Sequence, residues 1–183
     1  MSTSPKLKIP VSKEDHFQGP DKAPLVLVEY GDYQCPHCGR AYPIVKRVQK
    51  ALGDKIKFVF RNFPLSEVHP DALNAAKVAE GAALQGKFWE MHDLLFENQE
   101  SLDVQSLARY SDQLGLDGEE LNEAVAAPEV EEKVSMDFEG GVRSGVNGTP
   151  TFFVNGARYD GDWSYGPFLK SLEAVLAHEE SED

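Results

Sequence analysis

The chain has two cysteines, and both lie in one short segment, Cys35-Pro36-His37-Cys38. A continuous apolar run at residues 25–30 precedes this segment and has the composition of a strand buried on both faces of a parallel sheet. After the segment, apolar residues recur at helical spacing as far as Leu52, and Gly53 is a natural helix end. Residues 56–60 are rich in β-branched and aromatic side chains, which is typical of a second core strand. The order strand, helix, strand predicts a right-handed crossover between parallel strands, with the cysteines where the first strand gives way to the helix.

The pattern then becomes helical from about residue 66 to residue 145. We expect at least three helices there, one of them starting at Asp117 with Glu120 in a capping-box-like position. Strand character returns at residues 151–154, and Asn155-Gly156 is a strong signal for a hairpin turn. A closing amphipathic helix follows. The predicted apolar faces are Phe88, Met91 and Leu95; Val104, Leu107, Ala108, Ser111 and Leu114; Val130, Val134, Phe138 and Val142; and Phe168, Leu169, Leu172, Val175 and Leu176.

The two ends of the chain lack this regular pattern. The N-terminal end is rich in Ser, Pro, Lys and Asp, with Leu7, Ile9 and Val11 alternating as a possible edge strand. The C-terminal end is acidic and is expected to be solvated. The fold class is therefore α/β. The predicted parts are an N-terminal arm (1–22), a domain built on the sheet (23–65 and 146–177), an inserted helical domain (66–145) and an acidic tail (178–183).

The composition argues against several classes of protein. There are 18 Lys and Arg residues against 31 Asp and Glu, a net charge of −13. Because neutralising phosphates requires a surplus of basic residues, we expect no nucleic-acid partner. No apolar run approaches the roughly 20 residues that span a bilayer, so we expect no membrane partner. No apolar stretch of the length typical of a signal peptide is visible near Met1, so we expect none. The expected location is the cytoplasm, or an extracytoplasmic compartment if an export signal has been removed.

Cys35 is the candidate nucleophile. It stands where the first amides and the dipole of a helix favour an anionic sulfur. Pro36 suits the first helical position because it has no N–H to leave unpaired. His37 can lower the thiol pKa further by a hydrogen bond or a positive charge. Cys38, one turn further on, can attack the mixed disulfide formed by Cys35 and release the product.

The cysteine pair has two other interpretations. Two buried, inert thiols are one, although Pro-His between them brings no packing benefit. A zinc half-site is the other, and it would need two more ligands, which neither a second cysteine pair nor the scattered histidines supply. We therefore predict no metal and no dissociable cofactor.

Glu29 is a carboxylic acid inside the most apolar predicted strand. Burial would raise its pKa enough for it to hold or pass a proton near neutral pH. The alternative is a glutamate that faces solvent. Asp32, Tyr33 and Gln34 are expected to shape the turn rather than to take part in chemistry.

Three segments together resemble the DsbA-like branch of the thioredoxin-fold disulfide oxidoreductases: Glu29, the Cys35–Cys38 motif, and Gly148-Thr149-Pro150 with the strand and turn after it, over roughly residues 20–177. The resemblance implies βαβ and ββα halves around a mixed central sheet, with an inserted all-helical domain. It also implies that Cys35 attacks, that Cys38 resolves and that Glu29 is the buried carboxylate. Pro150 would be cis, although only about 5–6% of X–Pro bonds in folded proteins are. Thr149 would present its backbone to an extended substrate strand.

Two functions are compatible with these features. The first is a monomeric thiol–disulfide oxidoreductase that acts on protein thiols and disulfides and exchanges electrons with a redox partner. The second is a binding module whose helical block recognises a partner while the cysteine pair senses the redox state. A metal-binding protein is a third interpretation, which the zinc content of the purified protein tests.

Overall fold

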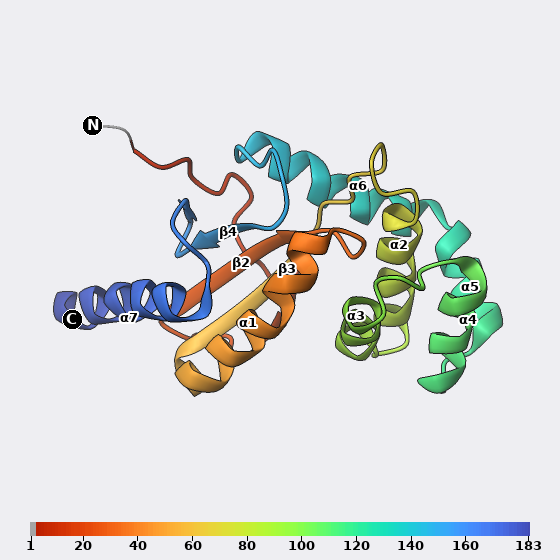
Figure 1. Cartoon of the computed structure of the whole chain (residues 1–183), viewed down its shortest axis with the longest axis horizontal. Coiled ribbons are helices and arrows are strands. Elements are labelled where there is room, and N and C mark those ends of the chain that lie inside the picture. The colour runs from red at the N-terminus through yellow and green to blue at the C-terminus, as the bar shows by residue number, and fades with distance from the viewer. Residues whose placement is uncertain (1–2) are drawn as a thin grey trace.

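The computed structural model describes residues 3–183. In these residues a mixed sheet lies on one side of the molecule and a group of helices on the other, with α1 at the boundary (Figure 1). The sheet has the strand order β1-β3-β2-β4-β5. Its strands are β1 (His16–Gln18), β2 (Leu25–Gly31), β3 (Ile56–Asn62), β4 (Thr151–Val154) and β5 (Ala157–Tyr159). The α/β fold class is confirmed.

The sheet contains both parallel and antiparallel strand pairs. β2 and β3 are parallel, as a strand-helix-strand unit requires, and α1 (Pro36–Leu52) makes the crossover. β4 pairs antiparallel with β2, and β5 pairs antiparallel with β4. Asn155 and Gly156 form the turn between β4 and β5, both with positive φ, as a hairpin of this kind requires. β1 adds an antiparallel edge beside β3.

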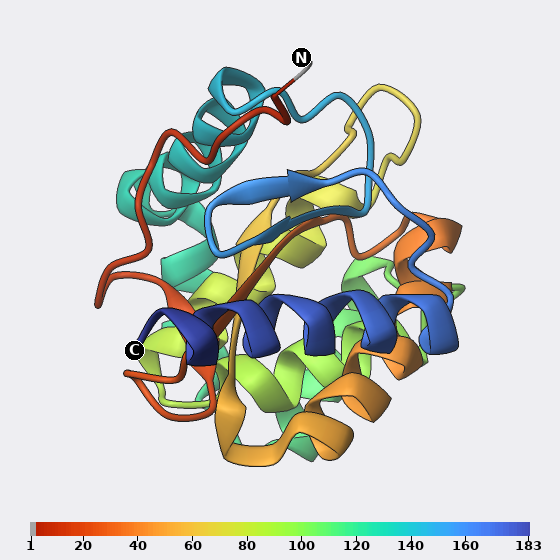
Figure 2. The same cartoon turned by 90° about the vertical axis from the view of Figure 1, so that its left-hand side faces the viewer.

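Buried side chains cover both faces of the sheet. Leu25 and Leu27 of β2 belong to one apolar cluster, with residues of α1 and of α7 (Tyr165–Glu182). Figure 2 shows α7 crossing in front of the strands. Val28 and Tyr30 of β2 belong to a second cluster, against which the N-terminal arm and Phe138 of α6 (Pro128–Arg143) pack. Because successive side chains of a strand point to opposite faces, Glu29 shares the face of Leu25 and Leu27.

The expected helical block is present between β3 and β4. Its helices are α2 (Ala72–Leu84), α3 (Phe88–Glu97), α4 (Val104–Gln113), α5 (Gly118–Ala126) and α6 (Pro128–Arg143). The predicted cap of α5 is confirmed, since the Asp117 side chain accepts a hydrogen bond from the Glu120 amide at 3.0 Å. No helix within residues 3–183 has the length and apolar character needed to cross a bilayer.

One prediction about the chain ends is wrong. Residues 7–11 do not form an edge strand; β1 at His16–Gln18 takes the edge, and the earlier arm makes an isolated bridge from Lys6 to Ala157. Pro10 lies within residues 7–11 and Pro5 lies just before them, and proline cannot donate to a ladder. The acidic end is exposed to solvent, as expected, and α7 continues through it to Glu182. No glycine or proline interrupts the helix there.

Three predicted core positions face solvent, and one of them is Ala108 of α4. Val104, the first residue of α4, is 72% exposed, and Val142 in the last turn of α6 is 53% exposed. Residues four apart drift by about 40° around a helix of 3.6 residues per turn. Val142, three such steps after Val130, has therefore rotated out of the buried face. Phe88, Met91 and Leu95 are buried as predicted.

Candidate active site

The two cysteines lie at the junction of β2 and α1. Cys35 precedes the helix with extended backbone angles (φ −70°, ψ 123°), and Pro36 takes the first helical position. Both cysteines are free thiols. Cys38 is completely buried, and the backbone N–H of Asp32 donates to its sulfur at 3.5 Å. The expected arrangement of strand, turn, cysteine and helix is therefore present.

The two thiols have very different acidities. A hydrogen bond from Cys38 and the backbone amides of Cys38 and His37 lower the pKa of Cys35 to about 5, even though burial opposes this. Burial, together with the hydrogen bond to Cys35, raises the pKa of Cys38 well above its ordinary value. At neutral pH, Cys35 is a thiolate and Cys38 keeps its proton. An anionic sulfur beside a protonated one suits nucleophilic attack followed by resolution.

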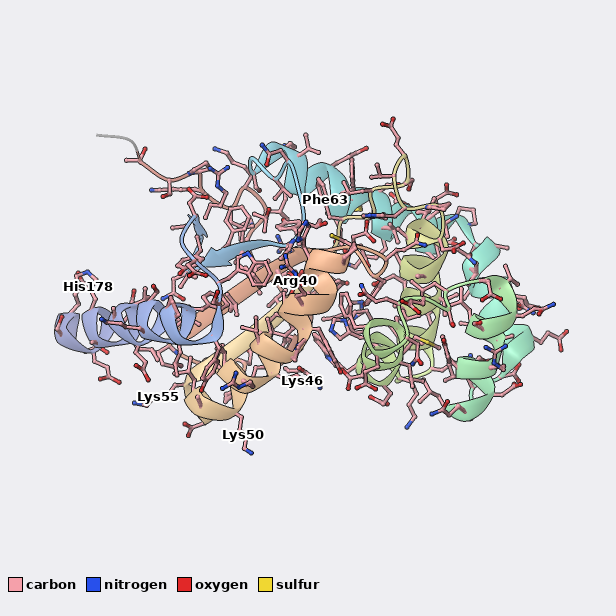
Figure 3. The ribbon with its side chains drawn as sticks, viewed as in Figure 1. Arg40, Lys46, Lys50, Lys55, Phe63 and His178 are labelled. Atoms are coloured by element: carbon pink, nitrogen blue, oxygen red, sulfur yellow. The ribbon has the colours of Figure 1, made fainter. Side chains whose placement is uncertain are left out.

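Cys35 is more buried than an attacking thiol is expected to be, with 3% of the residue exposed. The His37 ring also differs from expectation, because it is exposed and contacts Nη2 of Arg40 rather than the thiol. The contribution of His37 to the pKa of Cys35 is made by its backbone amide. Arg40 lies towards the upper end of α1 in the middle of the molecule, close to where β2 and the helical block meet (Figure 3).

Glu29 is buried, so the solvent-facing alternative is wrong. In the sheet it lies opposite Phe60 of β3 and Phe152 of β4. Burial, and after it the negative charge on Cys35, raise the pKa of Glu29 to about 8. A carboxyl group with this pKa can gain or lose a proton under physiological conditions.

Thr149 and Pro150 lie against the cysteines. The peptide bond between them is cis. Sγ of Cys35 lies 3.6 Å from the carbonyl oxygen of Thr149. Among the described residues, the buried hydroxyl of Thr149 has no hydrogen-bond partner. The loop before β4 thus brings residue 149, 114 positions away in sequence, next to the nucleophile.

Several residues of the helical block reach the active-site turn, and sequence reasoning missed them. Oη of Tyr33 lies 2.9 Å from Nδ1 of His92, a fully buried ring whose pKa burial lowers to about 3. Gln34 accepts from the Asp71 amide at 2.8 Å. Gln99 donates to the backbone of the turn. Their sequence neighbourhoods carry no motif, because these contacts depend on how α2 and α3 pack.

The described part of the chain contains no group of three or more His, Cys, Asp or Glu side chains placed to hold a metal ion. His16 pairs with Glu80, and His69 with Asp32. The arrangement around Cys35 offers thiol chemistry.

The sequence decides the family. A family model described as Thioredoxin matches residues 11–174. The chain belongs to the thioredoxin family. This match covers both cysteines, Glu29 and the Thr149–Pro150 loop, so the whole candidate site lies within the thioredoxin-family region.

Solved structures agree with this assignment. A thioredoxin-like oxidoreductase from Silicibacter pomeroyi DSS-3 is 26% identical, with a TM-score of 0.80, over 93% of this chain and 94% of that one. BdbD from Bacillus subtilis is 25% identical, with a TM-score of 0.82, over 96% and 98%. Wolbachia pipientis α-DsbA1 is 19% identical, and its TM-score of 0.84 over 96% and 97% shows the shared fold. The resemblance to DsbA-like members of the thioredoxin superfamily and the predicted thioredoxin fold are confirmed.

Curated relatives carry a different name. The Na(+)/H(+) antiporter NhaA 1 of Mycobacterium sp. (strain KMS) is 45% identical over 168 residues, which is 90% of this chain and 27% of that protein. The NhaA 3 antiporter of Salinispora tropica is 44% identical over 173 residues, or 93% of this chain and 26% of that protein. The chain thus spans about a quarter of the length of these relatives. Their name describes proteins most of whose length lies outside the match.

Proposed function

We propose that this protein is a thiol–disulfide oxidoreductase that exchanges disulfides with protein thiols through Cys35 and Cys38. One observation carries the proposal: two thiols one helical turn apart have pKa values displaced in opposite directions, with that of Cys35 at about 5. A structural thiol has no need of this difference, whereas exchange needs one sulfur ready to attack and a second held in reserve.

The reaction proceeds in two exchange steps. The Cys35 thiolate attacks a substrate disulfide, whose S–S bond breaks as a mixed disulfide forms and one substrate sulfur leaves as a thiolate. Cys38 then loses its proton and attacks the sulfur of Cys35. This step forms the Cys35–Cys38 disulfide and releases the second substrate sulfur, so that two electrons pass to the substrate. The reverse sequence oxidises a substrate dithiol and leaves the enzyme reduced.

Glu29 is our candidate for the proton acceptor in the second step. Its negative charge raises the pKa of Cys38, which means that the two groups interact and do not readily ionise together. A carboxylate with a pKa of about 8 can take the proton of Cys38 and later return it. Thr149 and Pro150 form the candidate binding site for the substrate backbone, next to Cys35.

The acidity of Cys35 favours the oxidising direction. A thiolate stabilised in the reduced protein makes the disulfide easier to reduce, and stabilisation of this kind makes DsbA a strong oxidant. We therefore propose that the protein donates its disulfide to substrate dithiols and is reoxidised by a separate redox partner. Cytoplasmic residence finds no support. The DsbA relationship favours the extracytoplasmic alternative, since disulfides persist in oxidising compartments.

The helices between β3 and β4 also enter the proposal. α2 packs against α3, α5 and α6, which supports residues 66–145 as an inserted helical domain. Because side chains of this region contact the active-site turn, a redox-sensing binding module is the second candidate function. Slow exchange with small thiols, combined with a partner bound in one redox state alone, would favour that second function.

Reduction of insulin by dithiothreitol tests the proposal. The Cys35→Ser variant should have no activity. Cys38→Ser, incubated with insulin in the absence of dithiothreitol, should accumulate a mixed disulfide, which added dithiothreitol then releases. Far-ultraviolet circular dichroism controls for folding of both variants. Turnover retained in a folded Cys35→Ser variant would contradict the proposal. Equilibration with a glutathione series then measures the direction: a potential near about −120 mV marks an oxidant and one near about −270 mV a reductant.

A further inference from the structure

Gln99 lies in the segment between α3 and α4, and its side chain reaches across to the active-site turn. Nε2 of Gln99 donates to the carbonyl oxygen of Tyr33 at 2.9 Å and to that of Cys35 at 2.8 Å. These two carbonyls flank Gln34, immediately before α1 begins. One side-chain amide from the helical block therefore holds both ends of the turn that carries the nucleophile.

The same carboxamide packs directly on the first turn of α1. A Cβ atom at Gly39 would lie 2.0 Å from Oε1 and 2.6 Å from Cδ of Gln99. The Gly39 amide donates to the Cys35 carbonyl at 3.0 Å. That carbonyl therefore accepts from two donors, one within α1 and one from Gln99. The close approach requires a residue without a side chain at position 39.

We propose that Gln99 is a positioning residue for the reacting thiol: by holding the Tyr33 and Cys35 carbonyls, it keeps the first turn of α1 aimed at the Cys35 sulfur. This inference rests on the proposed thiol–disulfide exchange. The amides of His37 and Cys38 stabilise the thiolate only while that turn keeps its geometry. Any displacement of the α3–α4 segment relative to β2 therefore changes the position of Cys35 through the hydrogen bonds of Gln99.

A merely structural role predicts a different outcome. If Gln99 only satisfies two backbone acceptors, its loss weakens the reduced and the oxidised protein by the same amount. If it positions the thiolate, its loss weakens the reduced protein more. By linkage, that difference appears as a shift of the redox equilibrium and of the Cys35 pKa.

Two substitutions separate the donors from the packing. Gln99→Met keeps most of the volume and removes both donors, and Gln99→Glu keeps the shape while adding a negative charge. The readouts are the thiolate absorbance of Cys35 against pH, the equilibrium constant with glutathione, and urea midpoints of both redox forms. We expect Gln99→Met to raise the Cys35 pKa and to lower the urea midpoint more in the reduced form than in the oxidised form. The equilibrium constant with glutathione should move about tenfold towards the protein disulfide, which is equivalent to about 30 mV. Gln99→Glu should produce larger shifts than Gln99→Met in the Cys35 pKa and in the equilibrium constant, because it also adds a negative charge.

A matched control is Gln113→Met, at an exposed position at the end of α4. It should leave all three readouts unchanged. Equal losses of stability in both redox forms of Gln99→Met, with an unaltered pKa and equilibrium constant, would overturn the inference. If the wild-type protein itself exchanges no disulfides, the proposed function fails instead, so the two failures are distinguishable.

Gly39→Ala gives an independent route if Gln99→Met does not fold. The added methyl group displaces the end of a flexible side chain and so breaks the Gln99 hydrogen bonds, although alanine itself suits a helix. Gly39→Ala should shift the glutathione equilibrium towards the protein disulfide, as expected for Gln99→Met. If Gln99→Met folds, the double variant should shift the equilibrium no further than either single variant. Additive shifts would show that the two residues act separately and would refute the positioning role.

Discussion

Oδ2 of Asp32 accepts a hydrogen bond from Nδ1 of His69 at 2.8 Å, which connects the active-site turn to the loop between β3 and α2. The same carboxylate accepts from the Leu65 amide at 2.9 Å and from the Gln34 amide at 2.7 Å. Asp32 also donates its own backbone N–H to the sulfur of Cys38. Asp32, whose side chain is fully buried, therefore contacts Cys38 through its backbone N–H and the loop before α2 through its carboxylate.

We predict that Asp32→Asn destabilises the protein by about 1–3 kcal/mol, the usual cost of leaving buried hydrogen-bonding groups unsatisfied. An amide offers one acceptor oxygen, so its NH₂ group must face at least one of the three donors. Urea unfolding measures the effect. Asp112→Asn, at an exposed position in α4, is the control and should change stability little. An unchanged midpoint in Asp32→Asn would show that the three bonds contribute nothing net.

Two substitutions of Cys38 test the origin of the Cys35 acidity. The hydrogen bond from Cys38 is the largest cause of the low Cys35 pKa. Cys38→Ala removes the donor and should raise that pKa, whereas Cys38→Ser keeps an O–H donor and should retain more of the depression. Iodoacetamide alkylation of Cys35 against pH gives the pKa in each variant. The same pKa in both variants would show that the Cys38 donor does not set the acidity of Cys35.

The sequence was sufficient for the part of the site that lies along one stretch of chain. Strand, cysteine motif and helix are consecutive, so hydrophobic pattern and turn chemistry predicted where Cys35 and Cys38 would lie. The resemblance implied a buried Glu29 and a cis Pro150. Periodicity alone left open whether the Glu29 side chain is buried or faces solvent, because the residues on both sides of it are apolar.

The contacts from the helical block could not be predicted in this way. Gln99, His69 and His92 reach the turn only after α2 and α3 have packed, and a polar residue near a helix end carries no signal of a partner about 60 residues away. For His37, in contrast, the sequence motif suggested a side-chain contact that the structure does not contain. Its position in the motif suggested a bond to Cys35, but the ring points to solvent and contacts Arg40.

The stability of the reduced protein should depend on pH through Cys35. Its pKa falls from 9.0 to about 5 on folding, so the unfolded chain binds the proton more tightly than the folded one. The stabilisation is complete above the unfolded pKa and is lost as the pH falls through about 5. Urea midpoints should therefore be higher for the reduced than for the disulfide form at pH 7, and the gap should narrow towards pH 5. A higher midpoint for the disulfide form at pH 7 would contradict a stabilised thiolate.

Glu29 should act in the opposite direction. Burial raises its pKa from 4.5 to about 8, so the folded protein keeps a proton that the unfolded chain releases. Its contribution is therefore fully present below pH 4.5 and is lost as the pH rises through about 8. Glu29→Gln, which imitates the protonated group, should gain stability relative to wild type as the pH rises over this range. The disulfide form is the one to measure, because Cys35 does not titrate in it. Without the charge on Cys35 only burial raises the Glu29 pKa, so the loss is expected at a lower pH than in the reduced protein.

The control for that measurement is Glu132→Gln on the exposed face of α6, whose stability should run parallel to that of the wild type at every pH. In the reduced protein, Glu29→Gln should also slow the release of mixed disulfides, because Cys38 would lose its proton acceptor while Cys35 still attacks. A selective loss in the second exchange step, with the first unchanged, would separate a proton-transfer role from a packing role. Parallel stability curves for Glu29→Gln and wild type would mean that Glu29 is ionised in the folded protein, and the assignment of the proton to this group would then be wrong.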